Sequence, residues 1–496
     1  MPDKHELRLL LNSSTPMICI ETRDEPTVLR LLTDIAVNTS ANLHRPLFRW
    51  SVTDGLQRID IELAPQPLNS EPGDVLGHIR ASNTPGIYCL LDFHPYLNDP
   101  TLVRRLKDIC LAFDTPRNKL VLISAGIKLP DDLRHYSATY QLAFPTEEKR
   151  TEIVQQIARE WRQENGGRSV KSDRRALTML VRNLAGLSEA DVRRLARNAI
   201  ADDGVIDHLD IENVMQAKYK LLNNDGLLSY EYDTARFTEV AGLSKLKDWI
   251  QKRRRTFLGE TARPGLDPPK GMLLIGVQGC GKSLAAKATA GALGTPLLRL
   301  EFGSLFNKYH GETERNLREA LTLAETMAPC VLWIDELEKG LSGREDTTGT
   351  AQRVLGAFLT WMAERKPGVF VVATANEIKK LPPELIRKGR FDEIFFVDLP
   401  KREVREEILA IHLKRRGCNP DLIDLPVVAK ATKHFSGAEL EQLVVSALHA
   451  ADADDSALTT QHLVAESEAT SPLAVVMAER ISELRQWAER RTVAAD

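Results

Sequence analysis

Residues 276–283 read Gly276-Val277-Gln278-Gly279-Cys280-Gly281-Lys282-Ser283. An apolar run over 272–275 precedes this segment and favours a strand, and a helical pattern follows it from Leu284. Glycines let the backbone turn with its N–H groups pointing inward, so that these amides and the helix N-terminus can bind phosphate oxygens. In such a loop Lys282 reaches the β- and γ-phosphates, and the hydroxyl of Ser283 holds Mg²⁺. We therefore expect residues 276–284 to bind a nucleoside triphosphate.

Composition and charge set the broad limits. The chain has 496 residues, enough for about three domains, and its 66 basic and 69 acidic residues give a net charge of −3. This balance provides no general attraction to nucleic acid or to an anionic membrane. The six cysteines lack metal-ligand spacing, and no apolar run approaches the ~18 residues of a membrane span. We expect a cytoplasmic protein with no membrane partner and with nucleic acid as a disfavoured one.

Two adjacent carboxylates end the next apolar run of the second half. Residues 331–334 favour a buried strand, and Asp335 and Glu336 follow it directly. Such a pair suits Mg²⁺-dependent hydrolysis, in which Asp335 binds the metal through its water shell and Glu336 polarises the attacking water. The alternative is an acidic pair on the surface with no role in a site.

A third strand and a pair of arginines follow. Residues 369–375 are apolar and lead into Asn376, whose amide could hold the attacking water against the γ-phosphate. Arg387 and Arg390 stand three residues apart and can present bidentate donors to a phosphate. The alternative for both arginines is a local ion pair with Glu384 or Asp392.

These motifs, in this order, resemble the AAA-proper clade of ATPases over about residues 232–465. The resemblance implies ATP and Mg²⁺ as cofactors and Asn376 as the first sensor of the γ-phosphate. It also implies that Arg387 and Arg390 are arginine fingers, which in this family act on the nucleotide of the neighbouring subunit.

The same resemblance identifies residues around the rest of the nucleotide. The segment 237–243 is similar to the family segment that borders the adenine, which assigns Ala241 and Gly242 to the base, and His412 matches a base-proximal histidine. A lone histidine is equally often a buried structural residue. Ala438, within 436–440, takes the lid position that contacts the nucleotide. Other AAA+ branches carry an arginine there, so its absence leaves arginines of a neighbour as the expected γ-phosphate sensors.

A substrate-gripping loop is expected by the same resemblance. Lys308, Tyr309 and His310 fall where the family places its first pore loop, from which an aromatic residue grips a polypeptide in the channel of a ring. Tyr309 occupies that position, whereas His310 departs from the usual aliphatic residue. Residues 342–349 are polar and suit a mobile second pore loop. The alternative for Tyr309 is an ordinary surface aromatic.

The first half repeats the order of the motifs without their chemistry. Residues 88–93 echo the run that ends in Asp335-Glu336, with Phe93 in place of Glu336, and residues 120–126 echo the third strand, with Gly126 in place of Asn376. Three further correspondences follow in order, which indicates two copies of one domain. After its first strand this half carries acidic residues where phosphates need donors, so we do not expect it to bind ATP. Alternatively, any strand–helix–strand fold would give such echoes.

We therefore expect an α/β fold of the P-loop (AAA+) type, a parallel sheet sandwiched by helices with an α-helical lid, preceded by a degenerate AAA/RecA-like copy. The expected domains are the degenerate domain (1–163), a helical lid-like subdomain with linker (164–225), the active large ATPase subdomain (226–400) and a lid subdomain with a C-terminal helix (401–496). That helix has an apolar face that includes Met477, Leu484 and Trp487, expected to pack on the core or on a neighbour.

Among AAA proteins, the chain resembles stand-alone ATPases encoded in some chloroplast genomes, cyanobacteria and other bacteria, long described as hypothetical reading frames. The resemblance rests on residues 328–336 and 386–396, where Lys388 replaces the proline common in other AAA proteins. With the features above, it implies ATP hydrolysis that drives remodelling or threading of a protein client by a homo-oligomeric ring, expected as a hexamer. A nucleic-acid-acting AAA ATPase, or a switch whose ATP state sets assembly, is the alternative.

Overall fold

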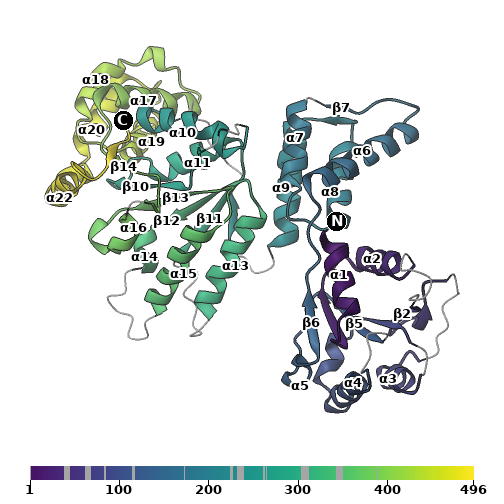
Figure 1. Cartoon of the computed structure of the whole chain (residues 1–496). Helices are drawn as coiled ribbons and strands as arrows, with labels where there is room; N and C mark the ends of the chain where they lie inside the picture. The colour runs from purple at the N-terminus through teal and green to yellow at the C-terminus, as the bar shows by residue number, and fades with distance from the viewer. Residues whose placement is uncertain are drawn as a thin grey trace. The chain divides into compact units, whose positions relative to one another are not determined.

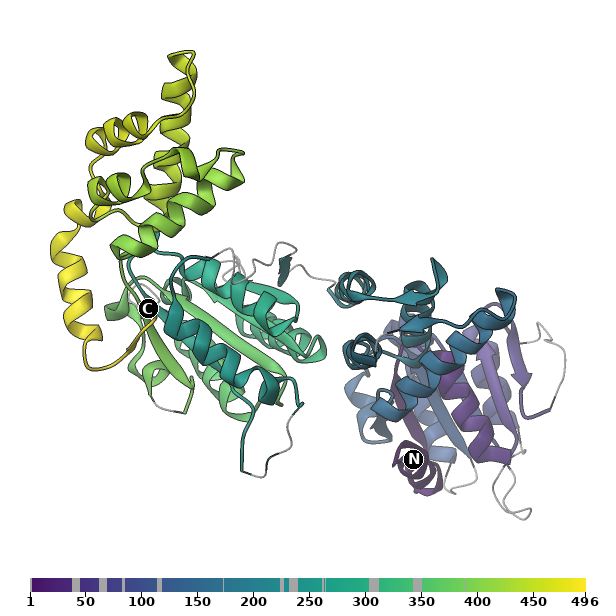
Figure 2. The same cartoon turned by 90° about the horizontal axis from the view of Figure 1, so that it is seen from above.

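The computed structural model describes residues 2–37, 45–61, 69–82, 85–113, 118–172, 174–223, 227–231, 240–260, 263, 265–302, 312–341, 350–387 and 389–496. These residues form two compact units, each built on its own sheet (Figures 1 and 2). The first unit comprises Met1–Val170 and Leu184–Gly204, and the second comprises Lys171–Asn183 and Val205–Asp496. The division into four domains at residues 163, 225 and 400 stays a prediction.

The first unit contains a six-stranded sheet in the order β3-β2-β4-β5-β1-β6. All neighbours are parallel except β2 and β3. The central strands β1, β4 and β5 are short, mostly apolar runs, because both faces of a parallel sheet are buried. The bounds are Met17–Glu21 (β1), Leu47–Ser51 (β2), Gly55–Arg58 (β3), Ile87–Leu91 (β4), Lys119–Ser124 (β5) and Ser137–Tyr140 (β6).

Helices cover both faces of this sheet. Alternate strand residues point to opposite sides, so Cys19 packs with α3 (Pro72–Ala81) and α4 (Pro100–Ala112), whereas Ile20 packs with α1 (Pro2–Asn12) and α2 (Glu25–Val37). The remaining helices of the unit are α5 (Asp131–Arg134), α6 (Glu147–Glu164) and α8 (Glu189–Ala201). The unit is thus a three-layer α/β domain.

The second unit contains a seven-stranded sheet in the order β15-β14-β10-β13-β12-β11-β9. Only the β9–β11 pair is antiparallel. The bounds are Ser229–Glu231 (β9), Gly271–Gly276 (β10), Leu297–Glu301 (β11), Cys330–Asp335 (β12), Val369–Ala375 (β13), Glu393–Val397 (β14) and Val493–Ala494 (β15). The middle of the sheet repeats the first unit, because β11-β12-β13-β10-β14 have the order of β2-β4-β5-β1-β6.

The second sheet is also covered on both faces. Leu273 packs on the side of α13 (Glu312–Thr326) and α15 (Thr350–Glu364), and Leu274 packs on the side of α10 (Ser244–Phe257) and α11 (Lys282–Leu293). Two shorter helices of this unit are α14 (Leu337–Leu341) and α16 (Pro383–Ile386). The second unit also contains the strands β7 (Lys171–Ser172) and β8 (Val205–Ile206) and the helices α7 (Arg174–Asn183) and α9 (His208–Leu222).

A helical bundle follows β14 and forms the lid. Its helices are α17 (Arg402–Arg415), α18 (Leu425–Ala431), α19 (Gly437–Ala453) and α20 (Thr460–Ala469), which share an apolar core of their own. The chain then returns to the sheet through α21 (Leu473–Val476) and α22 (Ala478–Ala488), which place Leu484 and Trp487 against the main core, and ends as β15 beside β14. The predicted C-terminal helix is therefore two helices plus an added strand.

The α/β fold with a helical lid and a preceding copy is confirmed, but one correspondence between the copies is wrong by one residue. Asp92 and Glu336 each follow a central strand with a φ of 49°. On this basis Asp92, rather than Phe93, matches Glu336. Phe93 then matches Leu337, and both side chains are fully buried. A shift of one residue turns every strand side chain to the other face, so packing decides this register.

Candidate nucleotide site

A cavity of about 860 Å³ lies at the carboxyl end of the second sheet. The ends of β10, β12, β13 and β14 meet there, which is where parallel α/β sheets bind ligands. The residues that line it come from the segment 240–245, the loop 278–284, the ends of β12 and β13, the end of β14 with the segment 398–401 after it, the lid, and residues 494–496.

The phosphate loop connects β10 to α11. Gly279 and Gly281 have φ values of 77° and 90°, a left-handed backbone that glycine adopts without strain. Gly281 caps α11, and a Cβ at this position would meet nothing within 4 Å, so the loop is open toward the cavity here. Lys282 is buried, and its Nζ donates to the carbonyl oxygens of Gly276 at 2.9 Å and Val277 at 2.8 Å. Burial lowers the pKa of Lys282 to about 8.

The two carboxylates of the second sheet lie at the end of β12. Thr374, on the adjacent strand β13, donates its hydroxyl to Oδ1 of Asp335 at 2.7 Å and accepts the amide of Glu336 at 3.1 Å. Arg299 donates to the other oxygen of Asp335 at 3.2 Å. One buried threonine therefore orients both carboxylate residues at once.

Asn376 directly follows β13 and lies against Glu336. Its Nδ2 donates to Oε1 of Glu336 at 3.3 Å, and its backbone N–H donates to Oε1 of Glu338 at 2.9 Å. Glu338 is buried, and burial raises the pKa of its carboxyl group. Lys339 forms an ion pair with Oε2 of Glu336. The side chains of Asn376 and Glu336 therefore lie together at the carboxyl edge of the sheet.

Residues predicted to lie near the base and in the lid also reach this cavity. Ala241, His412 and Ala438 all line it. Gly242 has a φ of 61° and donates its N–H to Glu407 at 3.2 Å, so it supports this wall through its backbone. Ala438 donates its N–H to the carbonyl of Gly279 at 3.0 Å, which joins the lid helix α19 directly to the phosphate loop.

The residues around this cavity fit ATP with Mg²⁺. The open loop and the buried amine of Lys282 provide positive charge and space for phosphates. Ser283 and Asp335 line the same cavity and supply the oxygen ligands that Mg²⁺ prefers. Cys280 also lines it, and burial raises the pKa of its thiol to about 12, which disfavours the reactive thiolate.

The two predicted arginine fingers are not brought to the cavity of their own chain. Arg387 and Arg390 are absent from the described lining, and Nη1 of Arg390 donates to the carbonyl of Leu359 on α15 at 2.8 Å. Lys308, Tyr309 and His310, the segment 342–349 and Lys388 lie outside the described residues.

Several lining or supporting residues were not identified from the sequence. Thr374 had a visible signal, because it is a lone hydroxyl in an otherwise apolar strand. Arg299, Glu338 and Arg415 have no such signal in the sequence, because charged residues are common on helices and near the edges of sheets. Asp496 lines the cavity from the far end of the chain and accepts from the N–H and hydroxyl of Ser244 at the start of α10.

The corresponding edge of the first sheet differs in chemistry. After β1, the buried carboxylate of Asp24 accepts the N–H of Thr27 at 3.3 Å, at the start of α2, and that of Ala190 at 3.4 Å. A carboxylate therefore occupies helix amides that would otherwise be available to a phosphate. Ser124 bonds Oδ1 of Asp92 at 3.1 Å and Nδ1 of His94 at 2.5 Å.

In the part of the chain that the structure describes, each helix is too short or too polar to traverse a lipid bilayer.

Comparison with known proteins agrees with this geometry. A model of the ATPase family associated with various cellular activities (AAA) matches residues 272–399. Models of the N-terminal and second domains of SpoVK-like AAA ATPases match residues 3–142 and 148–225.

Similar proteins extend over the whole chain. The AAA domain-containing protein ycf46 of Pyropia yezoensis is 34% identical over 488 residues, which are 97% of each chain. The ycf46 protein of Trieres chinensis is 35% identical over 486 residues, 97% of this chain and 96% of its own. The proteasome-activating nucleotidase of Aeropyrum pernix is 42% identical over 189 residues, 37% of this chain and 46% of its own. The chain therefore belongs to the AAA ATPases, in the family of ycf46 proteins with SpoVK-like N-terminal domains, and is an ATP-hydrolysing enzyme.

Proposed function

We propose that this ATPase is Mg²⁺-dependent, assembles into a homo-oligomeric ring, a hexamer, in the cytoplasm, and uses hydrolysis to remodel or thread a protein client. In this proposal Lys282 and Ser283 hold the phosphates and the metal, Asp335 binds the metal, and Glu336 activates the attacking water. Asn376 holds that water in line. Domain 226–400 with lid 401–496 would do the chemistry, and domains 1–163 and 164–225 would contact the client or a partner.

The orientation of Arg390 is the main observation that supports the proposed ring. Its guanidinium donates to Leu359 on α15 and is absent from the described lining of its own cavity. The guanidinium is always charged and presents paired donors that suit a phosphate. A neighbouring subunit offers a nucleotide, which supports an arginine that acts between subunits together with Arg387.

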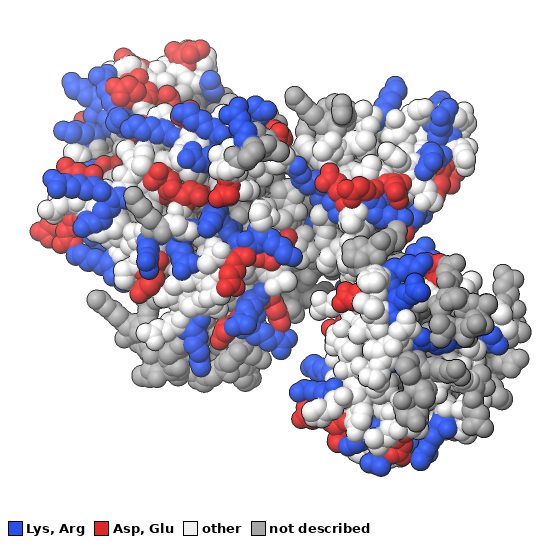
Figure 3. All heavy atoms as spheres, viewed as in Figure 1, with Lys and Arg blue, Asp and Glu red and all other residues white. Residues whose placement is uncertain are grey.

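A protein client is supported by two further observations. On the face drawn in Figure 3, acidic and basic side chains are interspersed within each unit, whereas tracking a nucleic acid favours a continuous basic groove. The second half is also similar to a protein named a proteasome-activating nucleotidase. From this similarity we infer for this chain only that its client is a protein.

Mixing two inactive variants tests the ring mechanism. Glu336→Gln keeps the arginines and loses the catalytic carboxylate, whereas Arg390→Ala keeps the carboxylate and loses the arginine. In a mixed ring, an Arg390→Ala subunit beside a Glu336→Gln subunit regains a complete site. We expect each variant alone to be nearly inactive and the mixture to recover turnover. No recovery, in mixtures in which differently tagged variants co-purify as one assembly, would contradict an arginine that acts between subunits.

Two measurements separate the ring from its client. Sizing with and without ATP should give an ATP-dependent oligomer, and a monomer under both conditions would exclude the ring. Tyr309→Ala should keep ATP turnover and lose unfolding of a captured substrate, since this tyrosine is proposed to grip the polypeptide. The client itself can be captured from a cell extract with ATP-loaded Glu336→Gln and identified by mass spectrometry.

A further inference from the structure

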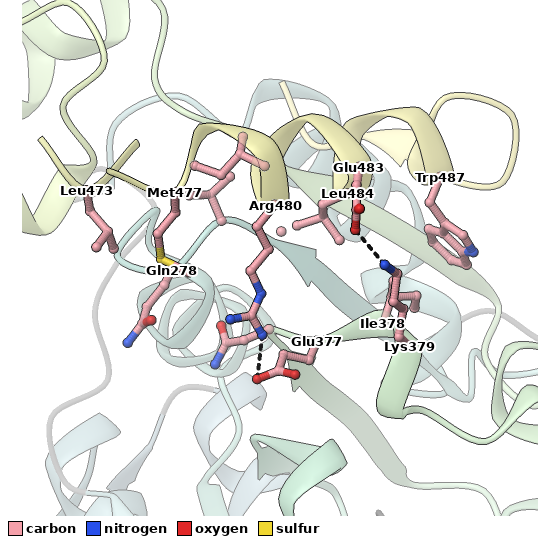
Figure 4. Close-up of a pocket in the computed structure, with 14 residues that line it drawn as sticks. Gln278, Glu377, Ile378, Lys379, Leu473, Met477, Arg480, Glu483, Leu484 and Trp487 are labelled. Carbon is pink, nitrogen blue, oxygen red and sulfur yellow. Dashed lines mark hydrogen bonds and ion pairs between the residues drawn. The ribbon is translucent and has the colours of Figure 1, made fainter. Parts of the chain in front are cut away.

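A second cavity lies beside the nucleotide site, on the side of the C-terminal helix. It has a volume of about 210 Å³ and lies between α22, the start of the phosphate loop and the segment 376–379 after β13 (Figure 4). Gln278 and Asn376 line both this cavity and the nucleotide cavity. The segment that carries Asn376 is therefore not backed by close packing on this side, where voids remove the contacts that would fix a side chain.

Two ion pairs connect α22 to this segment. Nη2 of Arg480 lies 2.6 Å from Oε1 of Glu377, and Nζ of Lys379 lies 2.5 Å from Oε2 of Glu483. Figure 4 shows Arg480 reaching from the helix to Glu377, while Glu483 meets Lys379 further along. Lys380 binds the second oxygen of Glu377 at 2.9 Å, so this carboxylate is held by two cations.

Glu377 is the residue directly after Asn376. The Asn376 backbone is held on its other side by Glu338, and its side chain donates to Glu336. A shift of Glu377 must therefore move Asn376 with respect to the carboxylate that would activate water. Misplacement by about 1 Å at such a site is enough to lower a rate by about a hundredfold.

We propose that Arg480 is a positioning residue for ATP hydrolysis, which through Glu377 holds Asn376 against Glu336. The inference rests on the proposed role of Asn376 in the reaction. It makes α22, more than 100 residues later in the chain than Asn376, a part of the site that no motif of the sequence identifies. Lys379 and Glu483 support the same segment as a second connection.

The exposure of the pair makes this role testable without unfolding the protein. The side chains of Arg480 and Glu377 are 52% and 31% exposed, and ion pairs this exposed contribute little to global stability because water screens them. Loss of the pair should therefore appear in kcat, with little change in the thermal midpoint or in KM for ATP.

Charge reversal with rescue is the experiment. Arg480→Glu places two carboxylates together and should lower kcat by about fivefold or more, with KM for ATP within about twofold. Glu377→Arg alone should do the same. The double variant restores the opposite-charge pair with residue 480 but not the ion pair with Lys380, so its kcat should rise at least about twofold above that of either single variant. The control is Arg80→Gln, which breaks an ion pair of similar exposure, with Asp108 at 3.2 Å, in the first unit. Because Arg80 lines neither of the two cavities, its loss should leave kcat unchanged.

The outcomes separate this inference from the proposed function. Unchanged kcat in Arg480→Glu, an equal loss in Arg80→Gln, or a double variant no faster than the single variants would overturn the positioning role. Asn376→Ala is measured alongside. If Asn376→Ala lowers kcat and Arg480→Glu does not, only the role of Arg480 is wrong. If Asn376→Ala keeps kcat, the proposed role of Asn376 is wrong, and the positioning role that rests on it is wrong too.

Discussion

Asp92 and Glu336 occupy the same backbone position in the two sheets, each as the first residue after a central strand and each with a φ of 49°. Their surroundings differ. Glu336 accepts from Asn376 and borders the nucleotide cavity, whereas Asp92 accepts from Ser124, which also bonds His94. The duplication has kept the backbone position of the carboxylate and changed the groups that it meets.

Amide substitutions at these two positions should therefore behave differently. Glu336→Gln removes the proposed base and should lower steady-state ATP turnover by about 10²–10⁴-fold while nucleotide binding persists. Asp92→Asn should leave turnover unchanged. Coupled-enzyme turnover assays, with fluorescent nucleotide binding as the control, distinguish them, and a comparable loss in Asp92→Asn would mean that the first half also takes part in hydrolysis.

Thr374 should be needed for the orientation of both carboxylates. Its buried hydroxyl bonds Asp335 and the amide of Glu336, and Thr374→Val leaves both partners unsatisfied at nearly constant volume. We expect a loss of about 1–3 kcal/mol in unfolding free energy and a higher Mg²⁺ concentration for half-maximal turnover. Thr374→Ser keeps the hydroxyl and should need the same Mg²⁺ concentration for half-maximal turnover as the parent protein. If Thr374→Ser raises this concentration as much as Thr374→Val does, the hydroxyl is not the cause.

Gly276 should tolerate no side chain. A Cβ there would lie 1.9 Å from the carbonyl oxygen of Val397 on β14, so Gly276→Ala must separate two central strands. We expect a loss of more than about 3 kcal/mol in unfolding free energy, measured by chemical denaturation. Gly356, within α15, is the matched control, because a Cβ there meets nothing within 4 Å. Gly356→Ala should stabilise the helix by about 0.5–1 kcal/mol. Equal effects of the two substitutions would contradict the steric cause.

His412 should give the protein a measurable pH dependence of stability. Burial lowers its pKa, an effect that Glu441 opposes and that Arg415 and Arg416 reinforce. The folded state then binds the proton less readily than the unfolded chain, whose histidine pKa is about 6.5, so this contribution to stability is present above about pH 6.5 and is lost as pH falls through the folded pKa. Denaturant unfolding from pH 8 to pH 5 should show a steeper loss for the parent than for His412→Gln. Parallel profiles would show that His412 does not titrate differently on folding.

The loop 276–283 and the run into Asp335-Glu336 could be predicted because each combines a local sequence pattern with a local structure. Three short apolar strands ending in polar groups also suffice to predict a parallel sheet with a site at its carboxyl edge. These features depend on residues adjacent in the chain, which is the range over which sequence periodicity is informative.

The remainder depends on contacts between distant residues. Thr374 contacts Asp335 and Glu336 because of the register in which β13 pairs with β12. Arg480 reaches Glu377 because α22 returns to the sheet. Whether Asp92 or Phe93 matches Glu336 depends on which of these two neighbours is buried. The apolar pattern of the strand fits both alignments, which differ by a shift of one residue. Arg390 was recognised as a phosphate-binding type, but only the structure shows that it points to α15.

The number of nucleotides bound per chain tests most directly whether the two halves share one working site. Calorimetric titration of Glu336→Gln with ATP and Mg²⁺ counts them without turnover, and Lys282→Ala in the same background removes the lysine of the second half. We predict one ATP per chain in Glu336→Gln and none after Lys282→Ala. Two per chain, or one that survives Lys282→Ala, would contradict a single site at residues 276–283.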